Sequence, residues 1–261
     1  MFSLRRLVSM STPLALLSCG GPNSVEIFHP GGSTGGSLIT VPFQVGGVQG
    51  PLTLQTEQGW TVQLTTAQIW LGPFYFNAFP PVTDQFRTGV VIVEATEQVL
   101  VNALDPTLQA VPGGADGETG QSVAVEIDLF PPGGTPQGST GCLLLEEQLG
   151  TLSGTATKGG TTIAFSGPIA IPNTASAQVP CLELEAIQGA SVNLSFTKAP
   201  QVLQLTVDPT HWFDLVDFSQ LLQGQPSAGV YGWSLRSEFM DQLIQGVKSE
   251  SGVYTFQLLS Q

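Results

Sequence analysis

The sequence predicts an all-β protein, a mostly antiparallel β-sandwich with one amphipathic helix near the C-terminus. Of its 261 residues, 31 are Gly and 19 are Pro, and these residues divide the chain at the short intervals typical of turns between strands. The apolar segments between the turns are short, follow one another at roughly 8 to 12 residues, and are not separated by amphipathic helices. The 14 Phe and the hydrophobic fraction of 41% are enough to build a large core.

The first half of the chain contains a series of strand candidates. Each is a short run of apolar or alternating residues bounded by Gly, Pro, Ser or Thr, which is the pattern of half-buried and buried strands. In order they span residues 38–45, 52–56, 60–65, 67–76, 89–93 and 98–104.

The candidate at 67–76 carries the aromatic residues Trp70, Phe74, Tyr75 and Phe76. Apolar side chains occupy both of its alternating faces, which is typical of a strand buried on both sides. We therefore expect a core strand. The alternative is a platform of aromatic rings that stacks against a sugar.

The second half continues the same pattern. Gly159 and Gly160 supply the positive φ angles of a tight hairpin turn and predict that their flanking strands pair. Segments 112–120 and 131–141 are expected to be loops, and neither is long enough to separate two domains. One sandwich over residues 25–261 and two fused sandwiches therefore both remain open. The strand candidates are 122–130, 142–146, 151–157, 161–165, 169–171, 182–187, 191–197, 202–207 and 253–259.

Two segments near the C-terminus predict helical structure. Asp208 followed by Pro209 predicts a helical turn over 208–213, with Asp208 as the N-cap and Pro209 at the first helical position. The segment 234–247 predicts an amphipathic helix capped by Ser234, whose apolar face covers one end or edge of the β core. The apolar residues of this segment at helical spacing are Leu235, Phe239, Leu243, Ile244 and Val247.

The charge balance excludes one class of partner. Seven Lys and Arg residues face 20 Asp and Glu residues, for a net charge of -13. Nucleic-acid binding depends on basic side chains that neutralise phosphates, so we expect no nucleic-acid partner. The acidic surface also argues against electrostatic docking to anionic lipid.

The N-terminal segment is typical of a secretory signal peptide. Arg5 and Arg6 precede an apolar stretch that is too short to span a bilayer. The stretch ends in Leu16-Leu17-Ser18-Cys19, which resembles the lipobox of bacterial lipoproteins. The alternatives are an ordinary signal peptide and a buried N-terminal strand.

The lipobox resemblance implies cleavage before a cysteine that is then diacylated. Residues 1–18 would be the signal peptide, Cys19 the lipidated first residue of the mature chain, and 19–24 a tether. No acidic residue directly follows Cys19. We therefore expect an anchor in the outer membrane, with its side of that membrane left open.

Cys142 and Cys181 remain once Cys19 is assigned to the lipid. They would lie in an oxidising compartment, so we expect them to form a disulfide that closes a loop of about 40 residues. The alternative is two free thiols or a redox pair, although the close Cys-x-x-Cys spacing of thiol oxidoreductases is absent.

The sequence lacks the common catalytic patterns. His29 and His211 are the two histidines, and no Gly-x-Ser-x-Gly elbow is present, so a Ser/His/Asp enzyme is not expected. Zinc-binding His pairs and phosphate-binding Gly-rich loops are also missing, and we expect no cofactor. A carbohydrate-active enzyme would need two carboxylates that face each other across a groove, which sequence cannot test.

One polar cluster is a candidate binding site. Asp208, His211, Asp214 and Asp217 lie within ten residues of a predicted turn, and could hold a cation or another ligand. In the alternative interpretation Asp208 is only a cap, the remaining polar residues are solvated, and the apolar residues Trp212, Phe213, Val216 and Phe218 pack into the core.

Several short phrases between residues 59 and 256 resemble a group of predicted outer-membrane lipoproteins that are abundant in myxobacteria and related bacteria. The resemblance implies a lipid-anchored, β-rich envelope domain and carries over no catalytic residues. The phrases are Gly59-Trp60-Thr61-Val62-Gln63-Leu64, Leu71-Gly72-Pro73-Phe74-Tyr75-Phe76, 101–106, 154–160, 207–213, Val216-Asp217-Phe218 and Tyr254-Thr255-Phe256.

Together these patterns predict a lipid-anchored protein of the cell envelope that binds a ligand or partner without catalysis. Its expected partners are the membrane, through the lipid, and an envelope protein or a small molecule. The alternative function is a metal-binding or transport accessory lipoprotein that uses the region 208–217.

Overall fold

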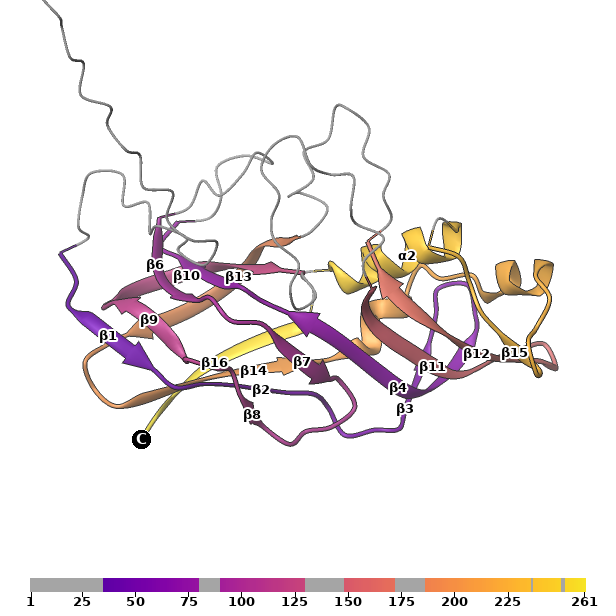
Figure 1. Cartoon of the computed structure of the whole chain (residues 1–261), viewed down its shortest axis with the longest axis horizontal. Coiled ribbons are helices and arrows are strands. Elements are labelled where there is room, and N and C mark those ends of the chain that lie inside the picture. The colour runs from indigo at the N-terminus through magenta and orange to yellow at the C-terminus, as the bar shows by residue number, and fades with distance from the viewer. Residues whose placement is uncertain (1–34, 80–89, 130–147, 172–185, 236, 250–251) are drawn as a thin grey trace, which may run out of the picture. The chain divides into compact units, whose positions relative to one another are not determined.

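Three β-sheets and a short helical segment make up the part of the chain that the structure describes. The computed structural model describes residues 35–79, 90–129, 148–171, 186–235, 237–249 and 252–261 (Figure 1). Most strand pairs in it are antiparallel, and one α-helix lies near the C-terminus. The predicted all-β class is confirmed. Among these residues no helix combines the length and the apolar character needed to cross a membrane.

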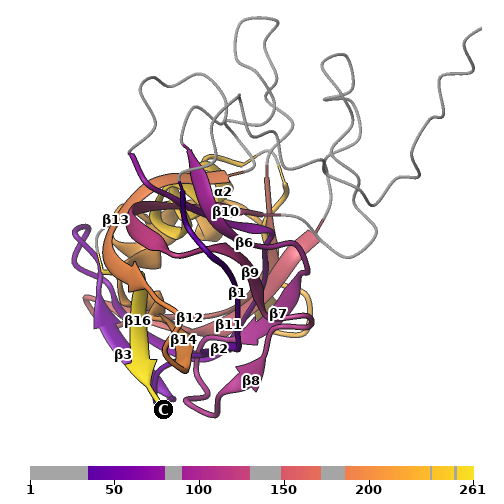
Figure 2. The same ribbon diagram turned by 90° about the vertical axis from the view of Figure 1, so that its left-hand side faces the viewer.

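Sheets A and B form a sandwich-like pair of layers. Seen end on in Figure 2, the strands of sheet A arch over those of sheet B. In spatial order sheet A contains β1 (Leu38–Val41), β9 (Ala115–Glu118), β6 (Val91–Ala95), β5 (Phe74–Asn77), β10 (Gly120–Asp128) and β13 (Ala186–Phe196). Sheet B contains β16 (Tyr254–Ser260), β14 (Gln201–Val207), β2 (Phe43–Gly46) and β8 (Gln109–Ala110), and its central pair β14 and β2 is parallel.

Sheet C is built on the long strand β4 (Thr61–Leu71). One edge of β4 pairs with β11 (Gln148–Lys158), which continues through β12 (Thr161–Ala170) to the short parallel strand β15 (Val230–Tyr231). The other edge pairs with two strands in succession, β3 (Leu52–Gln55) and β7 (Val99–Asn102).

Two groups of aromatic rings fill the core. Between sheets A and B, Phe43 packs edge-on against Phe74 with ring centroids 5.0 Å apart, and Phe76 does the same with Phe256 at 5.5 Å. Under sheet C, Phe165 contacts Phe218 at 5.0 Å. Such pairs add about 0.5–1.5 kcal/mol each to the stabilisation from burial alone.

The helical segment covers the inner face of sheet C. It consists of two 3-10 helices, η2 (Pro209–Phe213) and η3 (Phe218–Gln223), and the helix α2 (Glu238–Val247). Figure 1 shows α2 on one side of β4, β11 and β12, and its residue Phe239 packs on Phe218 with centroids 5.4 Å apart. The amphipathic helix is confirmed, but its N-cap is Ser237, whose Oγ accepts from Met240 N, rather than Ser234.

Local turn chemistry is confirmed where the prediction depended on it. Gly159 and Gly160 have φ angles of 57° and 85° in the β11–β12 hairpin. Asp208 caps η2 and accepts from the backbone nitrogen of Thr210.

Several strand boundaries were wrong. The strand predicted over 38–45 divides at Pro42 into β1 and β2, which join different sheets because Pro42 has no N–H to continue a ladder. The break expected at Thr66 does not exist, and β4 runs on to Leu71. The chain turns instead at Gly72, where φ is 104° and Pro73 follows. In the same way 161–165 and 169–171 are parts of one strand, β12.

The segment 112–120 was expected to be a loop, and it contains a strand instead. Its residues 115–118 form β9, which lies between β1 and β6 in sheet A. A Cβ at Gly117 would lie 2.1 Å from the carbonyl oxygen of Ile92. The lack of a side chain at Gly117 therefore allows β6 to approach closely, and pairing on both edges of β9 outweighs its low strand propensity.

Candidate functional site

The four residues of the predicted polar site serve separate local roles. Asp208 Oδ1 accepts from the backbone nitrogen of Thr210 at 2.9 Å and from its hydroxyl at 2.5 Å. Asp217 caps η3 and accepts from the backbone nitrogen of Ser219 at 3.0 Å. These two carboxylates are therefore engaged by the helix ends that they cap.

His211 and Asp214 form a pair on the surface. The distance from His211 Nδ1 to Asp214 Oδ2 is 2.8 Å, and the side chains are 47% and 37% exposed. No group of three or more His, Cys, Asp or Glu side chains that could hold a metal ion occurs among the described residues. The four residues thus do not converge as the cation-site interpretation required, because two of the carboxylates are turned toward their own helix ends.

The apolar residues of the same segment are buried. Trp212, Phe213, Val216 and Phe218 are each 0% exposed. This matches the alternative interpretation, in which the segment packs its aromatic residues under sheet C and leaves its polar residues for caps and the surface.

Asp217 also reaches a residue far away in sequence. The indole nitrogen of Trp60, a residue that is 3% exposed, donates to Asp217 Oδ1 at 3.2 Å. Partial burial opposes ionisation of this carboxyl, but hydrogen bonds from Ser219 and Trp60 and the charge of Lys158 outweigh it, so the pKa of Asp217 lies below its ordinary value.

The aromatic stretch divides between core and surface. Phe74, Tyr75 and Phe76 are at most 5% exposed in β5, so the predicted core strand is confirmed for them and they offer no platform for a sugar. Trp70 is half-buried at the end of β4, on the face that also carries Thr66 and Gln68.

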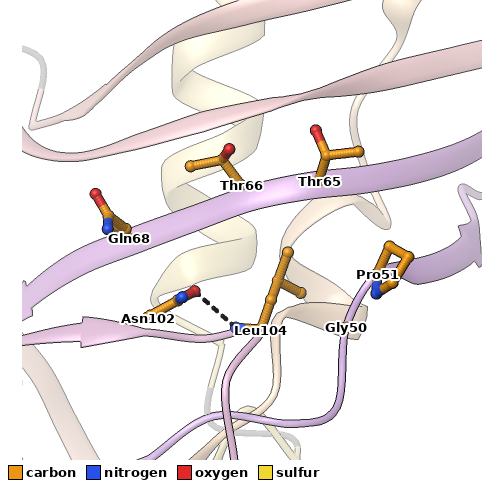
Figure 3. Close-up of a pocket in the computed structure, with 7 residues that line it drawn as sticks. All are labelled: Gly50, Pro51, Thr65, Thr66, Gln68, Asn102 and Leu104. Atoms are coloured by element: carbon orange, nitrogen blue, oxygen red, sulfur yellow. Dashed lines mark hydrogen bonds between the residues drawn. The ribbon is translucent and has the colours of Figure 1, made fainter.

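A notch in sheet C is the candidate functional site. The pairing of β3 with β4 ends at Leu64, and the pairing of β7 begins at Gln68. Because Ala67 O also accepts from Ala103 N, Thr65 and Thr66 lie opposite a gap between two strands that share one edge of β4. From Leu64 to Ala67 this gap is about 10 Å long at the rise of a strand. Figure 3 shows this gap, with Pro51 at the start of β3 on one side and Asn102 at the end of β7 on the other.

The rim opposite β4 is closed. The backbone nitrogen of Gly50 donates to the carbonyl oxygen of Leu104 at 3.0 Å, and Ala103 N donates to Ala67 O at 2.8 Å. A Cβ at Gly50 would lie 2.7 Å from that of Leu104, so a glycine is needed for this approach. The resulting pocket has a volume of about 400 Å³, within the usual range for small-ligand sites. Its described lining contains no charged side chain and consists of Gly50, Pro51, Thr65, Thr66, Gln68, Asn102 and Leu104.

Two carboxamides lie at one end of the notch. Gln68 and Asn102 are directly paired across β4 and β7. Asn102 Oδ1 accepts from Leu104 N at 3.1 Å, and Gln68 Oε1 lies 3.5 Å from the hydroxyl of Thr151. Figure 3 shows the Gln68 nitrogen on the side nearer Asn102. Both side-chain oxygens thus face protein donors, and both nitrogens remain available to a ligand.

A β-bulge shapes the long wall of the notch. The register of β4 against β11 shifts so that Thr65 is an extra residue between the pairs formed by Leu64 and Thr66. Ser153 Oγ donates to Thr66 Oγ1 at 2.8 Å, and Thr65 Oγ1 donates to Ser153 O at 3.1 Å. The hydroxyls of both threonines therefore bond toward β11, and both residues line the notch. Bulges commonly turn side chains in this way beside functional sites.

None of the notch residues was predicted as a site from the sequence. One signal was present, because the Thr65-Thr66 pair interrupts an otherwise regular alternation of buried and exposed residues, as a bulge does. The remaining lining residues come from segments about 50 positions apart in sequence and carry no local motif.

The predicted N-terminal and cysteine features lie outside the described residues. These are the signal peptide, the tether, Cys19, and the Cys142–Cys181 disulfide; His29 lies there too. Comparison of the chain with protein-family models, with curated proteins and with solved structures found no match.

Proposed function

We propose that this chain is a lipid-anchored, non-enzymatic binding domain of the bacterial cell envelope, and that it holds its ligand in the notch of sheet C. The observation that carries the proposal is the pair of carboxamide nitrogens, from Gln68 and Asn102, in a surface pocket of about 400 Å³ without any charged group in its described lining. Orienting a ligand with a few placed polar groups is what binding sites of this size do.

Support for a binding role rather than catalysis comes from the chemistry of the lining. The described lining contains amide, hydroxyl and apolar groups, and it contains no carboxylate, imidazole or thiol. General acid–base or nucleophilic catalysis needs a group that exchanges a proton near neutral pH. The hydroxyls of Thr65 and Thr66 both bond to Ser153 of β11 rather than to a base.

Support for the envelope location comes from the lipobox-like segment that ends at Cys19. Two or three acyl chains give stable anchoring, since each buried methylene contributes about 0.8 kcal/mol. The Cys142–Cys181 pair is proposed to be oxidised in that compartment.

Intact mass spectrometry of the protein from a bacterial membrane fraction tests the anchor. The wild type is expected to start at Cys19, to carry acyl mass, and to gain about 2 Da when its disulfide is reduced. The Cys19→Ala variant is the control and is expected to carry no lipid and to leave the membrane fraction. A wild-type protein without lipid would contradict the anchor, and two free thiols would contradict the disulfide.

A further inference from the structure

We infer that the notch binds a sugar unit of a neutral glycan. The inference rests on the proposed function and adds the chemical class of the ligand. It uses the positions of Gln68 and Asn102 at one end of the notch and of Pro51 and Leu104 in its walls.

The free polar groups of the notch are donors. A carboxamide has an oxygen that accepts and a nitrogen that donates twice. The oxygens of Gln68 and Asn102 face Thr151 and Leu104 N, and neither nitrogen has a hydrogen-bond partner among the described residues. Because the two residues are paired directly, their Cβ atoms lie about 5 Å apart. A ligand that presents two neighbouring acceptor oxygens would satisfy both.

The electrostatics favour a neutral ligand. An anion would find no cationic side chain in the described lining and would approach a chain of net charge -13. A cation would need acceptor oxygens, whereas the available groups are N–H donors. Hydroxyl, ether and carbonyl oxygens are the acceptors that remain.

The walls favour a ligand with an apolar face. Figure 3 shows the Leu104 side chain pointing toward β4, and the Pro51 ring stands beside Thr65. Thr65 and Thr66 line the same pocket, and their hydroxyls are engaged by Ser153 of β11. A sugar ring combines C–H faces with oxygens around its edge. Its C–H face would lie against these walls, and its oxygens would face the carboxamides.

The dimensions exclude an added peptide strand. Strand addition needs an open sheet edge, but β3 and β7 block both ends of a gap of about 10 Å, and the Gly50 to Leu104 hydrogen bond closes its rim. A compact ligand of one or two rings fits a volume of about 400 Å³.

The surroundings allow a longer glycan to continue past the notch. Outward positions of β3, β4, β11 and β12 alternate with buried ones, and apart from the exposed Lys158 at the end of β11 none of those described here is charged.

The test is a glycan array followed by calorimetric titration of the strongest hits, with the full lipidated protein in a zwitterionic detergent, since glycoside detergents would compete. The array contains neutral oligosaccharides, acidic oligosaccharides and peptides. The variant Gln68→Leu removes one pair of donors, and Gln63→Leu is the matched control on the same face of β4 outside the notch. The variant Thr65→Trp fills the notch from an exposed position.

We expect neutral oligosaccharides to bind, Gln68→Leu to weaken binding about tenfold through loss of one or two hydrogen bonds, and Gln63→Leu to leave it unchanged. Thr65→Trp should abolish binding while the far-ultraviolet circular dichroism stays native. If acidic glycans or peptides bind and the notch variants weaken them, the ligand class is wrong while the notch remains the site. If a ligand binds and no notch variant affects it, the assignment of the notch fails. If no neutral glycan binds, the inference is overturned, whatever the mass of the anchored protein shows.

Discussion

The indole nitrogen of Trp60 donates to the carboxylate of Asp217, and this bond joins the start of β4 to the cap of η3 across 157 positions of sequence. Asp217 looked like a candidate ligand in the sequence. In the structure its two oxygens accept from Trp60 and from the backbone and hydroxyl of Ser219, so its role is to attach the helical segment to sheet C.

Replacing Asp217 should therefore cost stability. Asp217→Ala removes the N-cap of η3 and leaves the Trp60 N–H without its acceptor, and we expect a loss of about 1 kcal/mol in the free energy of unfolding. Asp217→Asn keeps the acceptor oxygen and should lose less. Urea denaturation measures both, and equal losses in the two variants would contradict the capping role.

The same carboxylate should contribute to acid sensitivity. Its pKa is lower in the folded protein than the ordinary value of 3.8, so the folded state favours the ionised form. The resulting stabilisation is fully present above the unfolded pKa and is lost as the pH falls through the folded pKa. The difference in unfolding free energy between wild type and Asp217→Asn should stay constant above about pH 5 and shrink below pH 4. If the difference between the two unfolding free energies instead grew on acidification, the predicted role of the ionised Asp217 would be contradicted.

Phe165 should be a main support of the second aromatic group. Its ring contacts those of Phe218, Phe213 and Trp233, with centroids 5.0, 6.1 and 6.3 Å away. Phe165→Ala would leave a cavity beneath sheet C, and we expect a loss of about 3–5 kcal/mol in chemical denaturation. Phe79→Ala is the control, because Phe79 is 63% exposed, and it should change the stability by less than about 0.5 kcal/mol.

For Gly246→Ala, helix propensity predicts a gain in stability, whereas packing predicts a loss. Alanine is the better helix former by about 0.5–1 kcal/mol, but a Cβ at this position of α2 would lie 2.2 Å from the carbonyl oxygen of Trp212. We expect packing to dominate and Gly246→Ala to destabilise by about 1–3 kcal/mol. The exposed neighbour Gln245→Ala should be near neutral in the same thermal and urea melts. A stabilising Gly246→Ala would show that α2 and η2 are not packed this closely.

The surface pair of His211 and Asp214 should matter little to folding. Both side chains are substantially exposed, and such pairs contribute about 0–1 kcal/mol. His211→Ala and Asp214→Ala should each change the unfolding free energy by less than about 1 kcal/mol. Elemental analysis of the same proteins checks the metal interpretation, and a stoichiometric metal that both substitutions remove would restore it.

Local features of this fold could be predicted from sequence because a few adjacent residues decide them. The Gly159-Gly160 turn depends on positive φ angles, and the cap at Asp208 depends on one side chain and the next two residues. The burial of Phe74 and Phe76 followed from apolar residues on both faces of their strand. The break predicted inside β4 failed because Thr65 and Thr66 interrupt the alternation as a turn would, whereas pairing with β11 accommodates them as a bulge.

By itself, the sequence determined that the chain is all-β, where the Gly159-Gly160 turn and the Asp208 cap lie, and that one amphipathic helix lies near the C-terminus. Tertiary structure decided that β9 is a strand, that the polar residues of 208–217 separate into caps and a surface pair, and that a notch exists at all. The physical reason is the range of the interactions. Turns and caps are closed by neighbouring residues, whereas the notch arises because two strands about 50 residues apart pair with the same edge of β4 and leave a gap between them.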